Sequence, residues 1–201
     1  SGVLFHGLYL GGVFYSISIG IPTGIAALIV TLQPILTNAL SGSILGEKVT
    51  MKQWIGVLLG FVGAALVLGF DVGSDIPLLG LVATIIALIA ITTSTIWQKK
   101  LSNNLSLPVS NFYQAVGGCL FHILIMVIFT EPYIDFTKTF IIAMSHQIFF
   151  VSFGAFTILM FLIKKNSASK TVSIFFLIPA TSAFMAWLFL NESLTNLDLL
   201  G

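Results

Sequence analysis

The sequence predicts an all-α polytopic membrane protein, an inverted-repeat helical bundle, and composition is the first reason. Of its 201 residues, 57% are hydrophobic and only 7% are charged, with a mean hydropathy of +1.09. Soluble proteins carry roughly 25% charged residues, which wet their exterior, so lipid is the expected solvent here. The apolar runs also approach the length of about 20 residues that a spanning helix needs. Because the two-residue alternation of a membrane barrel is absent, helices are the expected spans.

Seven segments qualify as predicted transmembrane helices, and the connections between them are short and carry turn or cap residues. The third helix is expected to start at a capping box formed by Thr50 and Gln53, because these side chains can satisfy backbone amides at a helix start. The seven predicted helices cover residues 3–19, 23–45, 54–70, 78–97, 111–129, 140–163 and 172–190.

The lysines predict how the chain is oriented in the membrane. Seven of the eight lysines lie in three alternate connections, residues 46–53, 98–110 and 164–171, and the eighth is Lys138. Basic residues concentrate in cytoplasmic loops, so these three connections are expected to be cytoplasmic. The expected location is the inner (plasma) membrane of a bacterium.

An internal repeat with a spacing of 145 residues is the most informative feature. It aligns Pro34 with Pro179 and Glu47 with Glu192. The second copy is the fifth predicted helix after the first. Because successive helices alternate in direction, an odd step means that the copies cross the membrane in opposite directions. Inverted repeats are a recurring design of secondary transporters. The remaining aligned pairs are Leu32 with Leu177, Leu45 with Leu190, Thr50 with Thr195 and Gly56 with Gly201.

The repeat also predicts the domain organisation. Residues 1–70 are expected to be the last three helices of a first five-helix repeat, and residues 71–77 the connection between repeats. Residues 78–201 are expected to be a second repeat that lacks its last helix. The whole protein is accordingly expected to hold ten helices, with two before residue 1 and most of one after residue 201.

Two runs resemble the paired signature of the EamA-type drug/metabolite transporter superfamily. They are residues 28–56 (LIVTLQPILTNALSGSILGEKVTMKQWIG) and 172–201 (VSIFFLIPATSAFMAWLFLNESLTNLDLLG). Each has a proline-centred helix that ends in glutamate, then a short polar turn and a glycine. Residues 56–69 (GVLLGFVGAALVLG) also resemble that family's fifth helix. The resemblance implies a ten-helix permease with cytoplasmic ends and a central cavity between its halves, often an exporter of amino acids or other small metabolites.

Polar and aromatic side chains inside the spans are the candidates for a substrate cavity. Gln33, Thr37 and Ser41 share one helix stripe, and Asn38 flanks it. Amides that face lipid are costly, so this stripe should face other helices or a wet cavity, and ordinary hydrogen bonding between helices remains the alternative. The full set of cavity candidates is Tyr15, Gln33, Thr37, Asn38, Thr92, Gln114, His122, His146, Phe153, Thr181 and Ser182.

The two prolines are candidate hinges. Pro34 cannot bond the carbonyl of Val30, and Pro179 cannot bond that of Phe175, because proline has no amide hydrogen. Such carbonyls can contact a substrate or let the helix bend during transport. A plain kink is the alternative, since proline is common in membrane helices.

Glutamates and histidines add further candidates. Glu47 and Glu192 lie at helix exits and are candidate gate contacts, with helix capping or pairing with a loop as the alternative. His6, His122 and His146 lie at membrane depth. A histidine there can carry a coupling proton because its reference pKa is near 6.5, or it can serve as a neutral donor in a packed interface.

The sequence therefore predicts a secondary transporter, a permease or exporter that works by alternating access. No charged residue lies deep inside a predicted span, so the expected substrate is a small neutral, zwitterionic or amphipathic metabolite rather than a phosphorylated anion. The expected partners are the lipid bilayer, that substrate and a coupling proton.

Other functional classes have little in their favour. A membrane-embedded enzyme should show an acid, base or metal constellation, and the sequence has no HExxH, no GxSxG and a single cysteine, Cys119. We expect no catalytic residue, metal or cofactor. Lysines dispersed over short connections do not form a nucleic-acid site. A scaffold or receptor that does not transport remains an alternative.

Overall fold

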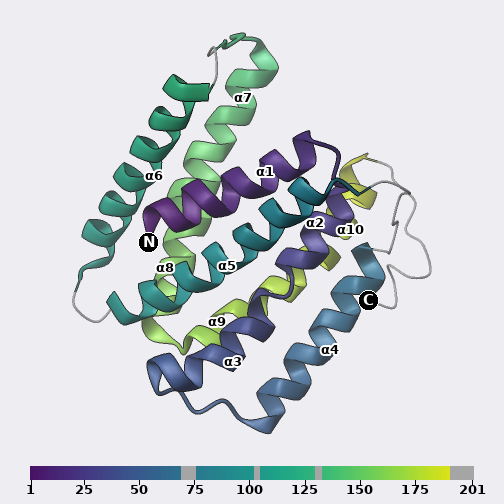
Figure 1. Ribbon diagram of the computed structural model, residues 1–201, viewed down its shortest axis with the longest axis vertical. Coiled ribbons are helices and arrows are strands. Elements are labelled where there is room, and N and C mark those ends of the chain that lie inside the picture. Colours follow the sequence, from purple (N-terminus) through teal and green to yellow (C-terminus); the bar gives the residue numbers. More distant parts are fainter. Residues whose placement is uncertain (69–75, 102–104, 130–132, 191–201) are drawn as a thin grey trace.

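A computed structural model describes residues 1–68, 76–101, 105–129 and 133–190. Over these residues every regular element is a helix (Figure 1), which confirms the predicted class of a polytopic helical membrane protein. Six helical segments of the described chain are long and apolar enough to span a membrane, and a shorter apolar helix covers Val3–Ser18. The inverted-repeat organisation as a whole stays a prediction.

Several of the membrane helices are built from consecutive segments. The first comprises η1, a π-helical stretch, and α1, and the second comprises α2 and α3. The sixth comprises α7, η2 and α8, and the seventh α9, η3 and α10. The bounds are η1 (Val3–Leu10), α1 (Gly11–Ser18), α2 (Thr23–Val30), α3 (Gln33–Leu45), α4 (Met51–Leu68), α5 (Leu78–Leu101), α6 (Leu107–Phe129), α7 (Lys138–His146), η2 (Gln147–Ala155), α8 (Phe156–Lys165), α9 (Ala168–Ser173), η3 (Ile174–Phe176) and α10 (Leu177–Leu190).

The helix α5 is the centre of the bundle. In its most apolar 18-residue stretch 56% of the residues are buried, whereas the corresponding share is 11% in α6 and in the span Lys138–Lys165. Figure 1 shows α5 in the middle, with α1 and the second helix beside it and the α6–α7 pair at the edge. Small side chains such as Ala87, which is fully buried, let neighbouring helices approach α5 closely.

The ends of the helices differ from the sequence-based prediction where capping extends them. The helix α4 starts at Met51 rather than at residue 54 because the capping box forms. Its two bonds run from the backbone amide of Thr50 to Oε1 of Gln53 (2.8 Å) and from the backbone amide of Gln53 to Oγ1 of Thr50 (3.3 Å). Ser167 caps α9 in a similar way, by accepting from the amide of Lys170 at 3.3 Å.

The lysine-bearing connections are therefore shorter than predicted. Lys99 and Lys100 lie in the last turn of α5, and Lys164 and Lys165 in the last turn of α8, rather than in loops 98–110 and 164–171. Positive charge at a helix C-terminus interacts favourably with the helix dipole, which explains why the helices continue through these residues.

Both proline-bearing helices are interrupted immediately before their proline. Thr31 and Leu32 separate α2 from α3, so the continuous helix predicted over residues 23–45 is broken, and Pro34 is the second residue of α3. In the seventh helix the 3₁₀ turn η3 precedes α10, whose third residue is Pro179. A proline ring clashes with the carbonyl four residues earlier and cannot bond it, so each break lies where the repeat places it.

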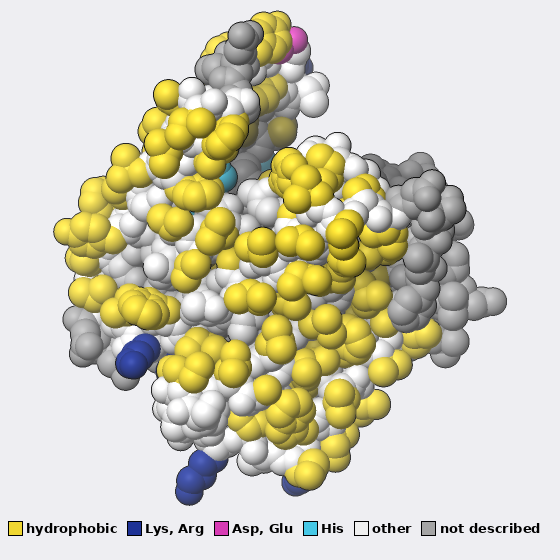
Figure 2. All heavy atoms as spheres, in the orientation of Figure 1, with side chains coloured by type: hydrophobic (Ala, Val, Ile, Leu, Met, Phe, Trp, Pro, Cys, Tyr) yellow, Lys and Arg dark blue, Asp and Glu magenta, His cyan; other side chains and the backbone are white. Residues whose placement is uncertain are grey.

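The three lysine-bearing connections meet at one end of the bundle. Nζ of Lys99 donates to the carbonyl of Asn166 at 2.6 Å, and Nζ of Lys164 donates to that of Leu105 at 3.0 Å. Figure 2 shows apolar side chains spread over the face of the bundle and lysines gathered toward its lower edge. Which side of a membrane this end faces stays a prediction.

Candidate functional site

A cavity of about 1050 Å³ lies between the two proline-bearing helices, the first helix and η2–α8. Pro34 and Pro179 both line it, although 145 residues separate them in the chain. The lining is mostly apolar and, over the described residues, contains no lysine, arginine, aspartate or glutamate. Its polar lining side chains are Thr23, Thr31, Gln33, Gln147, Ser152 and Ser182, together with His6 and Tyr9.

The break before Pro34 lies in the cavity wall. Val30 lines the cavity, and its carbonyl cannot receive the usual helical bond from residue 34, because proline has no amide hydrogen. In the other helix the amide of Leu177, the first residue of α10, bonds the carbonyl of Ile174 as part of the 3₁₀ turn. The two breaks are equivalent in position.

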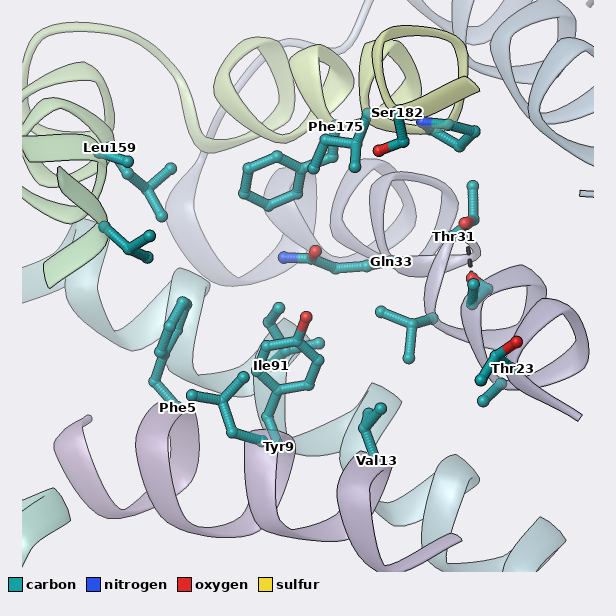
Figure 3. Close-up of a pocket in the computed structure, with 18 of the residues that line it drawn as sticks. Phe5, Tyr9, Val13, Thr23, Thr31, Gln33, Ile91, Leu159, Phe175 and Ser182 are labelled. Carbon is teal, nitrogen blue, oxygen red and sulfur yellow. Dashed lines mark hydrogen bonds between the residues drawn. The ribbon is translucent and has the colours of Figure 1, made fainter. Parts of the chain in front are cut away.

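Gln33 is the polar side chain at the centre of the cavity. Figure 3 shows it crossing the space between Phe175 on one side and Tyr9 and Ile91 on the other. Its Nε2 donates to Oγ1 of Thr95 at 3.1 Å, and the Thr95 hydroxyl in turn donates to the carbonyl of Ile91 at 2.9 Å. The Gln33 side chain is 1% exposed, so its orientation is set by the neighbouring helices.

Aromatic rings cover the first-helix side of the cavity. Phe5 lies against His6, Tyr9 and Phe156, with ring centroids 5.1, 5.6 and 5.3 Å away. The His6 ring is also 4.9 Å from that of Phe156. His6, a lining group that can carry a positive charge, is thus partly covered by two phenyl rings.

The cavity is closed toward the lysine-bearing end. No described residue of the three lysine-bearing connections lines it. Below it, the Glu47 carboxylate accepts from the backbone amides of Ala168 (2.8 Å) and Ser169 (3.4 Å), and Oδ1 of Asn38 accepts from the Ser169 hydroxyl. Toward the other end the lining includes the exposed residues Thr23 and Ser182. The cavity thus extends from buried Gln33 toward the end opposite the lysines.

Five of the residues that the sequence singles out come together at this cavity, namely His6, Gln33, Pro34, Pro179 and Ser182. Thr37 and Asn38 lie one turn further along α3 and are 0% and 2% exposed; neither lines the cavity, and Asn38 bonds Ser169 of α9. Oγ1 of Thr37 and Nδ2 of Asn38 are buried without a hydrogen-bond partner in the described part of the chain.

The candidates on α5 and α6 lie in helix interfaces. The Thr92 hydroxyl donates to its own helix, at the carbonyl of Leu88 (2.8 Å). Gln114, 4% exposed, donates to Ser110 at 3.4 Å. Nε2 of His122 lies 2.9 Å from the carbonyl of His6, so it joins α6 to the first helix. The bond of His122 joins two helices, the alternative expected for polar side chains inside the spans, whereas these bonds of Thr92 and Gln114 lie within single helices.

The remaining candidates lie on the surface. Tyr15 and Phe153 are 47% and 68% exposed, and His146 stacks on Phe150 at 5.4 Å beside a separate shallow pocket. Thr181 donates to carbonyls of its own helix turn. Glu192 lies outside the described residues.

Other lining residues were not selected from the sequence as cavity candidates. Phe5, Phe156 and Phe175 sit in predominantly apolar runs, in which a phenylalanine is expected to face lipid. Thr31, which flanks the polar stripe, does line the cavity, while its hydroxyl donates to the carbonyl of Ala27 at 2.6 Å. Thr31 and Phe175 lie at the helix breaks, residues 31–32 and 174–176, and this position is the signal that locates them.

Comparison with known proteins identifies the family of the chain. The family model described as the EamA-like transporter family matches residues 2–69 and 78–201. The chain belongs to the EamA-like transporter family. The resemblance found in its proline-helix runs is thereby confirmed.

EamA-like relatives share modest identity over nearly all of this chain. It is 28% identical to the "Uncharacterized transporter YvbV" of Bacillus subtilis, over 96% of this chain and 62% of that protein. It is 23% identical to a "Probable amino-acid metabolite efflux pump" of Salmonella typhimurium, over 94% of this chain and 66% of that protein. The chain therefore spans a little under two thirds of the length of these curated relatives.

A solved crystal structure has the same fold as this EamA-like chain. The TM-score is 0.80 at 16% sequence identity, and the match covers 98% of this chain and 70% of the other. The family and the names of the relatives point to a transporter rather than an enzyme. Among the described side chains, no group of three or more histidine, cysteine, aspartate or glutamate residues comes together as a metal site.

Proposed function

We propose that this protein is a secondary transporter that moves a small neutral, zwitterionic or amphipathic metabolite across a membrane by alternating access. The cavity between the proline-bearing helices is the proposed substrate site. The observation that carries the proposal is that Pro34 and Pro179, from helices that run in opposite directions, line one cavity at their helix breaks. Broken helices at a shared central site are a recurring feature of transporters built from inverted repeats.

The size and composition of the cavity support a small organic substrate. Its volume of about 1050 Å³ lies at the upper end of the range of roughly 300–1,000 Å³ found for small-molecule sites. An apolar wall with few polar groups is typical of such sites. The absence of charged side chains from the described lining disfavours a phosphorylated anion, which needs fixed positive charge in place of its lost hydration.

The asymmetric closure of the cavity supports alternating access. The contacts of Glu47 with Ala168 and Ser169 join the exit of α3 to the start of α9 on the lysine-bearing side. In the transport cycle we propose, these contacts break when the cavity opens to that side. By the positive-inside rule this side is the cytoplasm, and the membrane is the bacterial inner membrane. A coupling proton carried by a histidine of the bundle belongs to the same proposal.

The test is transport by the full-length protein in proteoliposomes. Radiolabelled amino acids, amines and neutral sugars are offered one at a time, and protein-free liposomes serve as the control. We expect saturable, protein-dependent movement of at least one neutral, zwitterionic or amphipathic compound, and competition by its close analogues. Selective transport of a polyanion such as a sugar phosphate, or binding of a compound without any movement of it, would overturn the proposal.

A further inference from the structure

The orientation of the Gln33 carboxamide determines what the centre of the cavity offers to a ligand. The Thr95 hydroxyl has one hydrogen, which it donates to the carbonyl of Ile91 at 2.9 Å. Its oxygen can then only accept, so the group of Gln33 that faces it at 3.1 Å must be the donor, Nε2. The amide cannot flip without placing two oxygen acceptors against each other. This leaves Oε1 of Gln33 directed away from Thr95, and no described donor bonds it.

A second acceptor lies on the same helix break. The carbonyl of Val30, a lining residue, cannot receive the usual helical bond from residue 34, because proline has no amide hydrogen. Neither this carbonyl nor Oε1 of Gln33 has a hydrogen to give, so both can only accept a hydrogen bond.

The remaining polar groups give no opposite preference, because the Gln147 amide both donates and accepts, and the hydroxyls of Thr31 and Ser152 already donate within their own helices. The hydroxyls of Tyr9 and Ser182 can donate or accept, and so they fit either kind of ligand. His6 lies under the Phe5 and Phe156 rings at 5.1 and 4.9 Å. The same phenyl rings, together with Phe175, suit an apolar body, and their faces also attract a cationic group.

We infer that the cavity selects compounds with a small apolar body and an N–H end group, an ammonium or a carboxamide, and that Oε1 of Gln33 is the acceptor that recognises this group. The inference rests on the proposed function, because it takes the cavity to be the substrate site. Thr95 is a positioning residue in this scheme, since it holds the amide in the accepting orientation without lining the cavity.

The test measures binding to the full-length protein in lipid nanodiscs with two matched pairs of probes. One pair is neutral, phenylacetamide and methyl phenylacetate, and the other is ionic, 2-phenylethylamine and phenylacetate. Within each pair the N–H compound is expected to bind about tenfold more tightly, the preference that one hydrogen bond to an otherwise unpaired buried group can provide. Isothermal titration calorimetry gives the four dissociation constants.

Three variants test whether Gln33 and Thr95 cause the preference for N–H compounds. Gln33→Met keeps the volume but removes the acceptor, so the ratio within the neutral pair should fall to near one. Thr95→Val frees the amide to flip and should reduce the ratio severalfold. Thr92→Val is the matched control, because Thr92 is a buried threonine of the same helix whose hydroxyl donates to the carbonyl of Leu88 and which does not line the cavity. It should leave the ratio unchanged.

Each result either supports the inference or overturns it. An unchanged ratio in Gln33→Met, tighter binding of methyl phenylacetate or phenylacetate in the unmodified protein, or no binding of either N–H probe overturns the role of Gln33. Should Gln33→Met fail to fold, the Thr95→Val and Thr92→Val pair decides the question. Transport in proteoliposomes separates this inference from the proposed function. Movement of a substrate with no dependence on Gln33 refutes only the inference, whereas Gln33-dependent binding without movement refutes only the transport proposal.

Discussion

The carboxylate of Glu47 accepts the backbone amide of Ala168 at 2.8 Å, and this bond joins the exit of one proline-bearing helix to the start of the other. A second amide, that of Ser169, lies 3.4 Å from the other carboxylate oxygen. The first amides of a helix have no partner within it, and a negative charge there also interacts favourably with the helix dipole. Glu47 is therefore a helix cap provided from a distant part of the chain, below the closed end of the cavity.

Replacing Glu47 with alanine should loosen this end of the bundle. We expect a loss of about 1 kcal/mol of stability, the usual effect of removing a cap, measured as a lower apparent unfolding temperature of the full-length protein in detergent. Glu47→Gln keeps an acceptor oxygen but loses the charge, so its unfolding temperature should lie between those of the unmodified protein and Glu47→Ala. Lys48→Ala is the control, since Lys48 is an exposed neighbour in the same connection. An equal effect of Glu47→Ala and Lys48→Ala would contradict the capping role.

Removing the hydroxyl of Ser169 should cost more than removing that of Ser173 on the same helix turn. The Ser169 hydroxyl donates to Oδ1 of Asn38, which is 2% exposed. Without the Ser169 hydroxyl, neither Oδ1 nor Nδ2 of the buried Asn38 carboxamide would have a hydrogen-bond partner, because Nδ2 already lacks one among the described atoms. We expect Ser169→Ala to destabilise the protein by about 1–3 kcal/mol. The Ser173 hydroxyl bonds only the carbonyl of Ser169 at 2.9 Å, so Ser173→Ala should change the unfolding temperature little.

Two glycines one turn apart on α4 should respond differently to alanine. A Cβ on Gly60 would lie 2.7 Å from Cδ2 and 2.8 Å from Cγ of Phe176, in the 3₁₀ turn before Pro179. A Cβ on Gly56 would meet no atom within 4 Å. Gly60→Ala should therefore destabilise by about 1–3 kcal/mol through overpacking, and Gly56→Ala should be neutral or stabilise by up to about 1 kcal/mol. Thermal unfolding of both variants checks this, and similar behaviour of the two would contradict the observed packing.

The connections before α4 and after α6 should lie on opposite sides of the membrane. The described chain crosses three times between Lys48 and Tyr133, through α4, α5 and α6, and both residues are exposed. In a Cys119→Ser background, Lys48→Cys and Tyr133→Cys can each be labelled with an impermeant thiol reagent in intact, sealed vesicles. We expect one to react before lysis and the other only after it. Reaction of both from the outside would contradict the proposed membrane topology.

The periodicity of the sequence predicts which face of a helix is buried. Gln33, Thr37 and Ser41, predicted to share a stripe facing other helices or a cavity, are all 1% exposed or less. On α6, Gln114 is 4% exposed and His122 reaches the carbonyl of His6. The spacing of 3.6 residues per turn places these side chains on one side of the helix. Because amides are costly in lipid, that side faces the interior of the protein.

Periodicity does not predict which part of the structure each residue of the α3 stripe contacts. Gln33 lines the cavity, whereas Asn38 bonds Ser169 of α9, because the seventh helix crosses α3 at that level. His146 and Phe153, which carry suitable chemistry for a cavity, lie on an outer face of the sixth helix. The crossing of two helices depends on the side chains of both, so a local pattern on one of them cannot specify it.

The sequence by itself determined the helical membrane class, the approximate extent of the spans, the capping box at Thr50 and the positions of the two prolines that break their helices. Each of these follows from hydrophobic length or from the bonding capacity of single residues, which are local properties. The tertiary structure alone decided that Pro34 and Pro179 share one cavity, that Glu47 caps α9 and that Thr95 orients the amide of Gln33. These relationships join residues more than 60 positions apart, and only the packing of whole helices brings them within bonding distance.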